Sequence, residues 1–573
     1  MTLGIDERRA AIRSRFPHWR PRTLGDWLDS CAVEHDSRPL VITDERILTY
    51  RAVVAESTRL AHGLAALGVH PGDRVGLLMA NHPEFVTLKF AIARLGAIAV
   101  PFNYLYRRDE LRYVLSDSGC RVLITMTAHG QTDYQQLLDE VVPSWGHTPL
   151  ACSDLPELRH VVVVPTCGVA ARPGVWTANE VAALDIGPPL PAVEPTAASD
   201  ILYTSGSTGF PKGVVLSHDA VLRTAFASAL TRAFEDGRRI LFSLPCYHMF
   251  GYVEGLLAAM FVGGVVILHT SFDADAYLRG IAKHRANDIL CVPTMALALL
   301  ESPVRYQKDH DTSSLRAIMC GSAAGPLELW SELAAAFAVD EIITGYGMTE
   351  SGGCMTLTLP EDDLAVTAQT VGRPKLAGAA GLPDTDALCV YRTVEPDTGA
   401  ALGSDCEGEL VSAGPATMLG YWNRPEQTGE TLRDGWVHSG DIGCVRADGY
   451  LTVLGRSKEL YKSGGELVMP REIENLLTAC DDISQAYAIG LRDRRWGEIG
   501  CVVVVPAQGA VLSADDVLAR CRAGLARFKV PKRVVFRDAA ALPTTPTGKV
   551  QKFKLAAELE QGSSSSLKGS DII

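Results

Sequence analysis

A loop that could bind phosphate stands in residues 201–218, ILYTSGSTGFPKGVVLSH. It offers an anion three kinds of group: hydroxyl donors, glycines that let backbone N–H groups converge, and a cation. These residues are Thr204, Ser205, Ser207 and Thr208, then Gly206 and Gly209, then Lys212. Because apolar runs flank the loop on both sides, we expect two short buried strands to hold its ends.

Two known motifs resemble this loop without fitting it. The P-loop pattern G-x-x-x-x-G-K-[ST] fails because Pro211 stands five residues after Gly206. The nucleophile elbow of serine hydrolases, G-x-S-x-G, needs a glycine where Ser205 stands. For the loop taken alone, a surface turn without a ligand stays open as an alternative.

The composition is that of a globular protein with more than one domain. The chain has 573 residues, of which 47% are hydrophobic and 21% charged, and its net charge is -13. An acidic balance disfavours broad binding to nucleic acids or to anionic membranes. We therefore expect small-molecule partners.

Cysteine usage and the apolar runs favour a cytoplasmic protein without a membrane span. Fourteen cysteines lie scattered without a C-x-x-C pair, which predicts neither a zinc site nor a disulfide framework. The N-terminal MTLGIDERRAAIRSRF lacks the apolar core of a secretory signal, and we expect a solvated helix there. The longest apolar runs, around 85–102 and 253–268, are interrupted and too short to span a membrane.

Alternating apolar and amphipathic segments predict the fold class. Runs such as RVGLLMA, AIAVPF, RVLIT and HVVVVP alternate with helical patterns, and the alternation recurs from ILFSLP to EIITGYG. After about residue 375 come short strands and many glycines, and from residue 470 a compact α+β pattern. The prediction is an α/β protein: a large N-terminal domain of doubly wound sheets with a small β-rich layer, and a small mobile α+β C-terminal domain. We place these domains at 1–457 and 458–560, with a disordered tail at 561–573.

Six motifs, in this order, resemble those of the adenylate-forming superfamily, which includes acyl-CoA synthetases, 4-coumarate ligases, luciferases and peptide-synthetase adenylation domains. The motifs are YTSGSTGFPKG, GYGMTES (345–351), GYWNRPEQT (420–428), HSGDIG (438–443), GRSKELYKSGGE (455–466) and PTTPTGKVQK (543–552). The resemblance spans about residues 40–555 and favours the acid:CoA ligase branch. It implies an enzyme that converts a carboxylic acid and ATP into an acyl-adenylate, then transfers the acyl group to a thiol and releases AMP.

The resemblance assigns a site for ATP and Mg²⁺. The opening loop would cradle the β- and γ-phosphates, Tyr346 would stack on adenine and Thr349 would hydrogen-bond the α-phosphate. Glu350 would bind Mg²⁺, a hard cation that prefers oxygen ligands, while Asp441 and Arg456 would hold the ribose. The other residues of the nucleotide site would be Gly321, Ser322, Ala323, Gly347 and Met348.

The resemblance also implies two half-reactions separated by a domain rotation. Lys549 would be the catalytic lysine of adenylation, bridging the substrate carboxylate and the α-phosphate. Lys458 would be the hinge. After the rotation a tunnel would admit the pantetheine chain of CoA, lined by Lys462, Ser463, Gly464 and Gly465.

The residues matching the acyl pocket are mostly apolar, aromatic or small: Tyr247, Phe250, Gly251, Met319, Gly321 and Ala323. His248 beside them is expected to gate the pocket, and packing alone is the alternative. Relatives that activate amino acids carry an aspartate in the first stretch, but none lies between Pro245 and Gly255, and Glu254 comes late. We therefore predict a hydrophobic acid that is fatty, alicyclic, terpenoid or aryl.

Several alternatives stay open at this point. The acceptor is CoA or a separate carrier protein, because nothing after residue 555 resembles a carrier domain. The protein could run mainly one half-reaction beside a partner ligase, and it could form a homodimer. A luciferase-like oxidase and a non-catalytic nucleotide-binding protein are further alternatives. Four residues disfavour the last one: Lys212, Glu350, Asp441 and Lys549.

Overall fold

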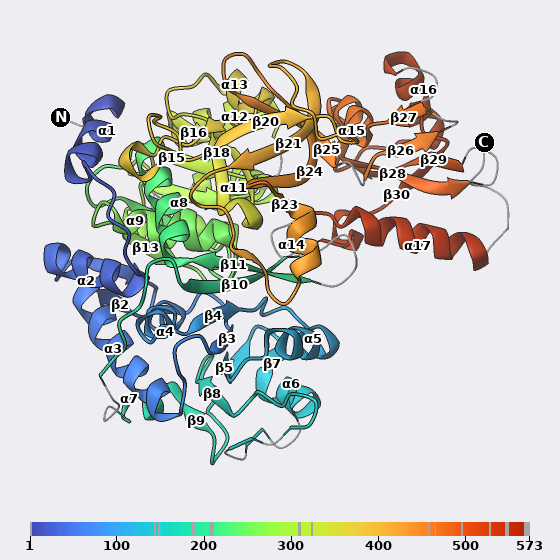
Figure 1. Cartoon of the computed structure of the whole chain (residues 1–573). Helices are drawn as coiled ribbons and strands as arrows, with labels where there is room; N and C mark the ends of the chain where they lie inside the picture. The colour runs from blue at the N-terminus through green and yellow to red at the C-terminus, as the bar shows by residue number, and fades with distance from the viewer. Residues whose placement is uncertain are drawn as a thin grey trace. The chain divides into compact units, whose positions relative to one another are not determined.

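The computed structural model describes most of the chain, which divides into two compact units (Figure 1). The first unit comprises Met1–Val390 and Ser412–Val437, and the second comprises Tyr391–Val411 and His438–Ile573. The described residues are 3–142, 145–146, 149–150, 152–184, 189–204, 211–306, 311–321, 325–456, 459–463, 466–493, 497–525, 529–544 and 549–565. The domain limits at 457/458 and 560/561 stay predictions.

An eight-stranded sheet of the first unit carries both ends of the predicted phosphate loop. Its order is β22 (Gly420–Tyr421), β11 (Lys212–Ser217), β10 (Ala198–Thr204), β4 (Ile98–Pro101), β3 (Arg74–Leu78), β5 (Val122–Met126), β8 (His160–Val164) and β9 (Trp176–Thr177). The strands from β10 to β9 are parallel, whereas β10, β11 and β22 pair antiparallel. The predicted flanking strands of the loop are thereby confirmed.

A second, seven-stranded sheet carries the segments that match the acyl pocket. Its order is β16 (Glu341–Ile343), β15 (Ala317–Cys320), β14 (Asp288–Cys291), β12 (Arg239–Phe242), β13 (Val265–Leu268), β1 (Pro39–Ile42) and β2 (Ile47–Thr49). All its pairs are parallel except β1 with β2. Val, Ile and Leu dominate its buried strands, as expected where both faces of a parallel sheet are covered.

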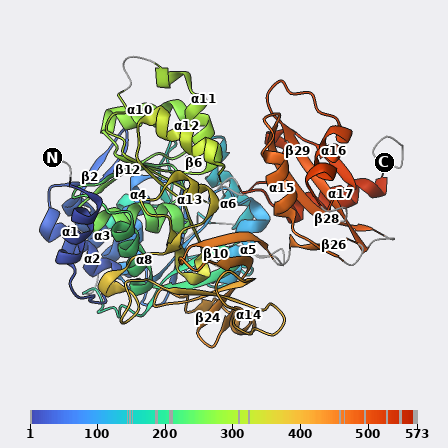
Figure 2. The same cartoon turned by 90° about the horizontal axis from the view of Figure 1, so that it is seen from above.

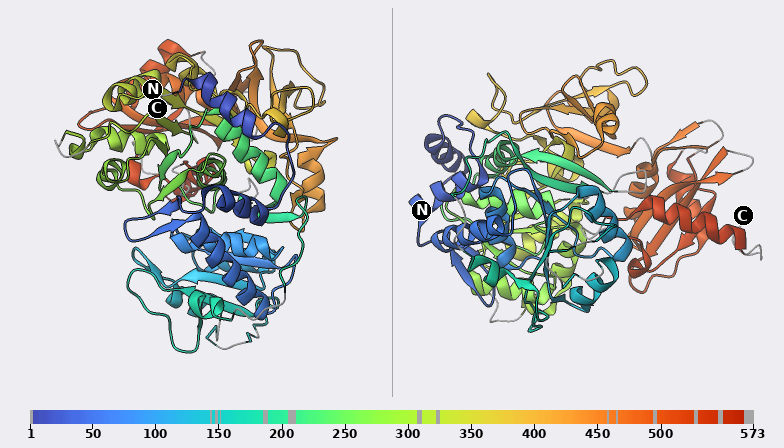
Figure 3. Two further views of the ribbon diagram at one scale, coloured as in Figure 1. Left: turned by 90° about the vertical axis from the view of Figure 1, so that its left-hand side faces the viewer. Right: turned by 60° about the horizontal axis from the view of Figure 1, so that its bottom comes forward.

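Helices cover both sheets of the first unit, which confirms the predicted doubly wound α/β class. With the first sheet belong α2 (Leu24–His35), α3 (Tyr50–Ala66), α4 (Pro83–Arg94), α5 (Arg108–Ser118), α6 (Tyr134–Val141) and α7 (Ala178–Ala182). The remaining helices are α8 (His218–Thr231), α9 (Ala258–Met260), α10 (Ala274–His284), α11 (Pro293–Glu301), α12 (Leu327–Phe337), α13 (Leu364–Gln369) and α14 (Pro425–Thr431). Figure 2 shows α10, α11 and α12 lying together, and Figure 3 shows the blue and green layers of this unit.

A small three-stranded sheet presents the GYGMTES motif. It is formed by β17 (Gly345–Met348), β18 (Gly353–Leu357) and β19 (Arg373–Pro374), and β17 leads into a 3₁₀ turn, η3 (Thr349–Ser351). A Cβ atom built on Gly347 would lie 2.0 Å from the carbonyl oxygen of Gly353. This close approach of two backbones explains why glycine stands there.

The strands after residue 390 form the predicted β-rich layer and α+β domain. The first sheet orders β20 (Val390–Val394), β21 (Glu407–Ala413), β24 (Trp436–Val445) and β23 (Leu432–Arg433), with β25 (Leu451–Arg456) paired to β24. The second orders β27 (Glu466–Val468), β26 (Tyr461–Ser463), β29 (Gly497–Pro506) and β28 (Ile483–Asp493), with β30 (Arg533–Phe536) on β29. Helices α15 (Pro470–Thr478), α16 (Ala514–Gly524) and α17 (Lys552–Ser565) accompany them. Helix α17 continues into the segment predicted as a tail, and residues 566–573 lie outside the described part.

The N-terminal helix α1 (Ile5–Arg15) forms as predicted but is solvated on one face only, because Arg8, Arg9 and Ile12 are buried. Arg8 and Arg9 are only 5% and 8% exposed. Arg8 pairs with Glu341, while Arg9 donates to Glu361 and to the carbonyl oxygen of Thr231. The guanidinium groups can be buried because carboxylates and a carbonyl oxygen accept their hydrogen bonds. In the part of the chain that the structure describes, no helix is long and apolar enough to cross a membrane.

Candidate active site

The two ends of the predicted phosphate loop lie side by side in one strand ladder. Thr204 ends β10 and Lys212 begins β11, and the register pairs these two residues directly. Five predicted phosphate-binding residues lie outside the described residues: Ser205, Gly206, Ser207, Thr208 and Gly209. The strand pairing fixes where the loop starts and where it ends.

Polar contacts with α5 hold both flanks of this loop. Before the loop, the Tyr203 hydroxyl donates to the Asp117 carboxylate over 2.8 Å. After the loop, the Tyr113 hydroxyl donates to the carbonyl oxygen of Pro211 over 3.2 Å. Asp117 also accepts a hydrogen bond from Arg424 of the GYWNRPEQT motif. One helix and one distant motif therefore anchor the base of the loop.

Tyr421 joins the phosphate lysine to the predicted metal carboxylate. The Lys212 ammonium lies 4.9 Å from the centre of the Tyr421 ring, within the range of a cation–π interaction. The Tyr421 hydroxyl donates to Glu350 Oε1 over 2.8 Å. Burial, followed by the charge of Glu350, raises the pKa of Tyr421, so the phenol keeps its proton and remains a donor. Sequence reasoning quoted the motif that contains Tyr421 but gave the residue no role.

The GYGMTES segment places its predicted residues on one strand and the turn that follows. Tyr346 and Met348 are half-buried and Gly347 is exposed on β17, whereas Thr349 and Glu350 are only 8% and 7% exposed in η3. The carbonyl oxygen of Glu350 accepts the N–H of Met418, a residue just before Tyr421. The backbone thus fixes Glu350 from one side while Tyr421 orients its carboxylate from the other.

Glu350 offers the donor that Mg²⁺ needs in a nucleotide site. In proteins Mg²⁺ is commonly held by one or two carboxylates together with substrate phosphates. Among the described residues, no cluster of three or more His, Cys, Asp or Glu side chains could hold a metal without a substrate. One oriented carboxylate near a phosphate loop therefore fits a magnesium ion that arrives with ATP.

The acyl side of the site brings together two segments that are distant in sequence. Gly321 follows β15, and a Cβ atom built on it would lie 3.1 Å from Cε1 of Phe250. Phe250 and Met319, which are 9% and 2% exposed, belong to the same hydrophobic core. The predicted acyl residues Phe250 and Gly321 thus lie together, and Met319 lies two residues before Gly321 on β15. Ser322 and Ala323 lie outside the described residues.

The segment that precedes Phe250 supplies His248 and Tyr247. The His248 side chain keeps exposed surface, yet the surrounding protein desolvates it and lowers its pKa to about 4. Its Nδ1 atom accepts the N–H of Phe250 over 3.4 Å, which leaves the proton of the neutral ring on Nε2. The Tyr247 hydroxyl is buried without a hydrogen-bond partner. Gly251 is packed so closely that its Cβ would lie 2.5 Å from the carbonyl oxygen of Leu244.

Asn81 is a supporting residue that sequence reasoning missed. Its side-chain amide donates to the carbonyl oxygen of Leu244 over 2.9 Å and accepts the N–H of Cys246 over 2.9 Å. These two bonds fix the turn from β12 into the Tyr247 and His248 segment. No local pattern signals this role, because 165 residues separate Asn81 from Cys246.

The predicted ribose residues lie on neighbouring strands of the β-rich layer. The register of β24 and β25 places Asp441 opposite Arg456. Asp441 is 5% exposed, and its N–H donates to Ser439 Oγ over 3.0 Å. Glu409 accepts the N–H of Gly440 over 2.9 Å, which holds the same turn.

The residues predicted for the domain rotation, the CoA tunnel and the adenylation lysine are described only in part. Lys458, Gly464 and Gly465 lie outside the described residues, as does the Lys462 side chain. The backbone of Lys462 and the buried Ser463 belong to β26. Lys549 is exposed between β30 and α17.

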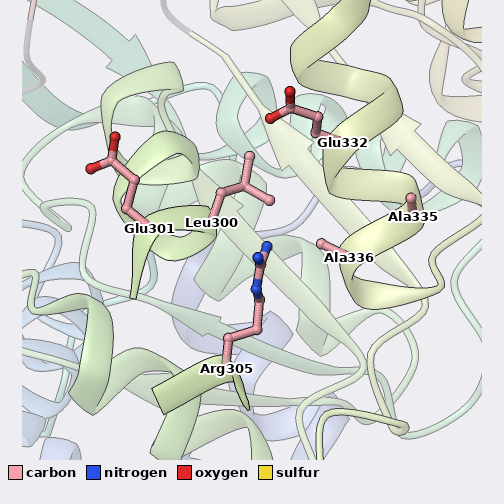
Figure 4. Close-up of a pocket in the computed structure, with 6 residues that line it drawn as sticks. All are labelled: Leu300, Glu301, Arg305, Glu332, Ala335 and Ala336. Atoms are coloured by element: carbon pink, nitrogen blue, oxygen red, sulfur yellow. The ribbon is translucent and has the colours of Figure 1, made fainter. Parts of the chain in front are cut away.

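A separate hollow of about 590 Å³ lies between α11, the 3₁₀ turn η2 (Pro303–Tyr306) and α12 (Figure 4). It is lined by Leu300, Glu301, Arg305, Glu332, Ala335 and Ala336. None of these residues belongs to a motif, and we assign the hollow no part in the site.

Comparisons with known proteins agree with these motifs. Residues 28–422 match the family described as AMP-binding enzyme, and residues 472–549 match the AMP-binding enzyme C-terminal domain. A feruloyl-CoA synthase from Amycolatopsis is 38% identical over 539 residues, which cover 93% of this chain and 98% of the relative. A Mycobacterium tuberculosis CoA ligase for a methyl-dioxo-octahydroindenyl propanoate is 34% identical over the same shares.

Solved structures of CoA ligases share the fold. An anthranilate CoA ligase in complex with anthranoyl-AMP has a TM-score of 0.80 and 26% identity, covering 96% of this chain and 99% of that one. A fatty acyl CoA synthetase from Mycobacterium tuberculosis has a TM-score of 0.71 and 31% identity, covering 94% and 99%. The chain belongs to the adenylate-forming AMP-binding enzyme family and is an AMP-forming acid–thiol ligase, an acyl-CoA synthetase.

Proposed function

We propose that this ligase activates a hydrophobic carboxylic acid and transfers it to CoA. The acid attacks the α-phosphorus of ATP, giving an acyl-adenylate and pyrophosphate. The thiol of CoA then attacks the acyl carbon, giving the thioester and AMP. Fatty, alicyclic, terpenoid and aryl acids are the candidates.

The observation that carries the proposal is the apolar contact of Phe250 with Gly321. The ring packs so closely on Gly321 that a Cβ atom there would lie 3.1 Å from it, and an aromatic wall of this kind suits a hydrophobic substrate. Glu254, the one acid near this segment, is 1% exposed and bound to Lys375 over 2.5 Å. It is therefore occupied and does not serve as the partner of a substrate ammonium.

In the adenylation step, the first unit would screen repulsion between two anions. Lys212 and Mg²⁺ would neutralise the phosphates, with Mg²⁺ held by Glu350 and by ATP itself. Thr349 would bond the α-phosphate, and Tyr346 would stack on adenine. Asp441 and Arg456 would bind the ribose.

In the second step, a domain that pivots at Lys458 would remove Lys549 and present a tunnel for the CoA chain. The proposed domain limits, 1–457 and 458–560, follow from this pivot. The glycines at 464 and 465 suit a thin pantetheine chain, which favours CoA over a carrier protein. All fourteen cysteines are free, which supports a reducing cytoplasm.

The test is to offer purified protein MgATP and a panel of hydrophobic acids, with and without CoA. Pyrophosphate release reports adenylation, and mass spectrometry of acyl-CoA reports the whole reaction. We expect both for at least one acid, including an aryl acid because the feruloyl-CoA ligase is a near relative. Activity with amino acids alone would contradict the proposal. Turnover of synthetic acyl-adenylates without adenylation would instead identify a specialist for one half-reaction.

Replacing the predicted adenylation lysine should separate the two half-reactions. We expect Lys549→Ala to reduce pyrophosphate release by roughly a thousandfold, because a charge-stabilising group is lost from the transition state. A supplied acyl-adenylate should still be converted to the thioester. Lys554→Ala, at another exposed lysine on α17, is the matched control and should leave both steps unchanged. An equal loss of both steps in Lys549→Ala would contradict the assignment of Lys549 to adenylation.

A further inference from the structure

The acyl side begins with an unusual helix whose geometry has to be maintained. Phe250–Leu257 forms a π-helix, η1, and all eight of its residues are buried. Helices with i→i+5 hydrogen bonds are rare and are frequently found at functional sites. A return to the ordinary α-helical pattern would rotate Phe250 relative to the later residues of the helix. The shape of the acyl side therefore depends on what holds η1.

A buried ion pair holds η1 from within the protein core. The Glu254 carboxylate accepts a hydrogen bond from Lys375 Nζ over 2.5 Å and another from the Ser228 hydroxyl. Glu254 and Lys375 are 1% and 0% exposed. The carbonyl oxygen of Glu254 accepts Arg232 over 3.1 Å. The side chain and the backbone of one residue are thus both fixed by hydrogen bonds.

The partner lysine belongs to the layer that carries the nucleotide motif. Lys375 follows β19, its N–H donates to Met355 on β18, and β18 pairs with β17 of the GYGMTES motif. A second contact joins the same two regions: a Cβ atom built on Gly353 of β18 would lie 2.8 Å from Cε of Met249, directly before η1. The ion pair therefore links η1, which contributes Phe250, to the sheet that contains β17, where Tyr346 is proposed to stack on adenine.

Stability alone is a weak reason for such a pair. Removing two charges from water is costly, and well-packed apolar residues often stabilise a core as well or better. A buried ion pair instead favours one arrangement over others, because a buried charge is costly in any arrangement that separates it from its partner. Here Glu254 stands four residues after Phe250 on the same π-helix.

We propose that Glu254 and Lys375 are positioning residues that determine which acids fit, by fixing the π-helical turn behind Phe250. The inference rests on the proposed function, since it takes Phe250 and Gly321 as the acyl wall. Neither charged residue touches the substrate. They act through the backbone of η1, and the pair should therefore affect the choice of acid more than the use of ATP.

The test compares acid selectivity in paired variants. Glu254→Leu with Lys375→Met removes both charges together, so that no unpaired charge is left buried and the core stays apolar. Lys375→Glu with Glu254→Lys restores an ion pair of reversed direction. Arg8→Met with Glu341→Leu is the matched control, since that pair is also buried but joins α1 to the start of β16.

Each variant is assayed for kcat and KM with straight-chain acids of increasing length, with bulky aryl acids and with ATP. We expect the apolar double variant to flatten the preference among acids by roughly tenfold, with the KM for ATP changed less than about threefold. The reversed pair should recover most of the preference, and the control should retain it. Thermal melts identify any variant that fails to fold.

Unchanged acid preference in a folded apolar double variant would overturn the inference. So would an equal loss of preference in the Arg8 and Glu341 control, because a general weakening of the core would then explain both. The two failures can be told apart from failure of the proposed function: in that case the parent protein itself activates no hydrophobic acid.

Discussion

The phosphate side and the acyl side of the first unit are built in different ways. We use phosphate side for β10, β11 and β22, and acyl side for η1 with the end of β15. On the phosphate side, strand ladders place Thr204, Lys212 and Tyr421 through backbone hydrogen bonds. On the acyl side, η1 is fixed by the Glu254 and Lys375 side chains, and a glycine faces Phe250.

This difference teaches where the enzyme can change. Backbone hydrogen bonds form with almost any side chain, so we expect the strands of the phosphate side to tolerate substitutions better. The acyl side depends on particular side chains and on glycines without Cβ atoms, so single substitutions alter it. The names of the similar proteins share CoA ligation and differ in the acid, from ferulate to fatty acids.

The largest effect is expected on the phosphate side at Tyr421. Tyr421→Leu removes both the ring beside Lys212 and the hydroxyl on Glu350, and should lower kcat/KM for pyrophosphate release roughly a hundredfold. Tyr421→Phe keeps the ring, and should lose about tenfold with a raised Mg²⁺ requirement. Binding of Mn²⁺ with ATP, followed by electron paramagnetic resonance, gives a readout independent of turnover. A changed acid preference in either variant would break the comparison.

A smaller effect, on the choice of acid rather than on the use of ATP, is expected at Gly321 on the acyl side. In Gly321→Ala the new methyl group would lie about 3.1 Å from the Phe250 ring, which must shift by a few tenths of an ångström. We expect kcat/KM to fall about tenfold for bulky acids and to stay nearly constant for short ones. The KM for ATP should not move. Gly429→Ala, in open space on α14, is the control for an added methyl group.

The last comparison concerns stability, and two histidines whose pKa values are both lowered. Burial lowers the pKa of His218, which follows β11, to about 4, and desolvation lowers the pKa of His248, which precedes η1, to about 4. His218 is fully buried, with Nδ1 accepting the N–H of Leu24. When the chain unfolds, its pKa returns to about 6.5, so acid favours the unfolded state. The stability tied to His218 is present above pH 6.5 and is lost as the pH falls towards 4.

This linkage predicts that His218→Asn removes about 2 kcal/mol of the stability lost between pH 7 and pH 5. Urea unfolding at the two pH values measures it, with His70→Asn, at an exposed histidine, as the control. His248 retains exposed surface, so we expect its protonation to affect acid binding rather than unfolding. An unchanged pH slope in His218→Asn would contradict the assignment.

Much of the phosphate side could be predicted from the sequence because its signals are local. Glycines and hydroxyl residues between two apolar runs predict a loop between strands. Thr204 and Lys212 lie at the ends of those strands, as expected. The GYGMTES motif likewise fell on a strand and a turn. In each case neighbours in sequence are also neighbours in space.

The supports of the acyl side could not be predicted because they link distant segments. Glu254 and Lys375 are 121 residues apart, and neither a π-helix nor an ion pair of this kind has a periodicity that reveals it. Charge was also misleading in α1, where arginines typical of a solvated helix are buried against carboxylates. Burial of polar residues depends on partners, and the partners are known only once the chain is folded.

The contacts of α1 also bear on the order in which the chain is made. Arg8 and Glu341 are separated by 333 residues, and Arg9 and Glu361 by 352. The ribosome releases the helix first, and its carboxylate partners leave only after most of the first unit has been synthesised. Helix α1 cannot form these ion pairs until its partners have been synthesised, and we expect it to be among the last elements to dock onto the first unit during biosynthesis.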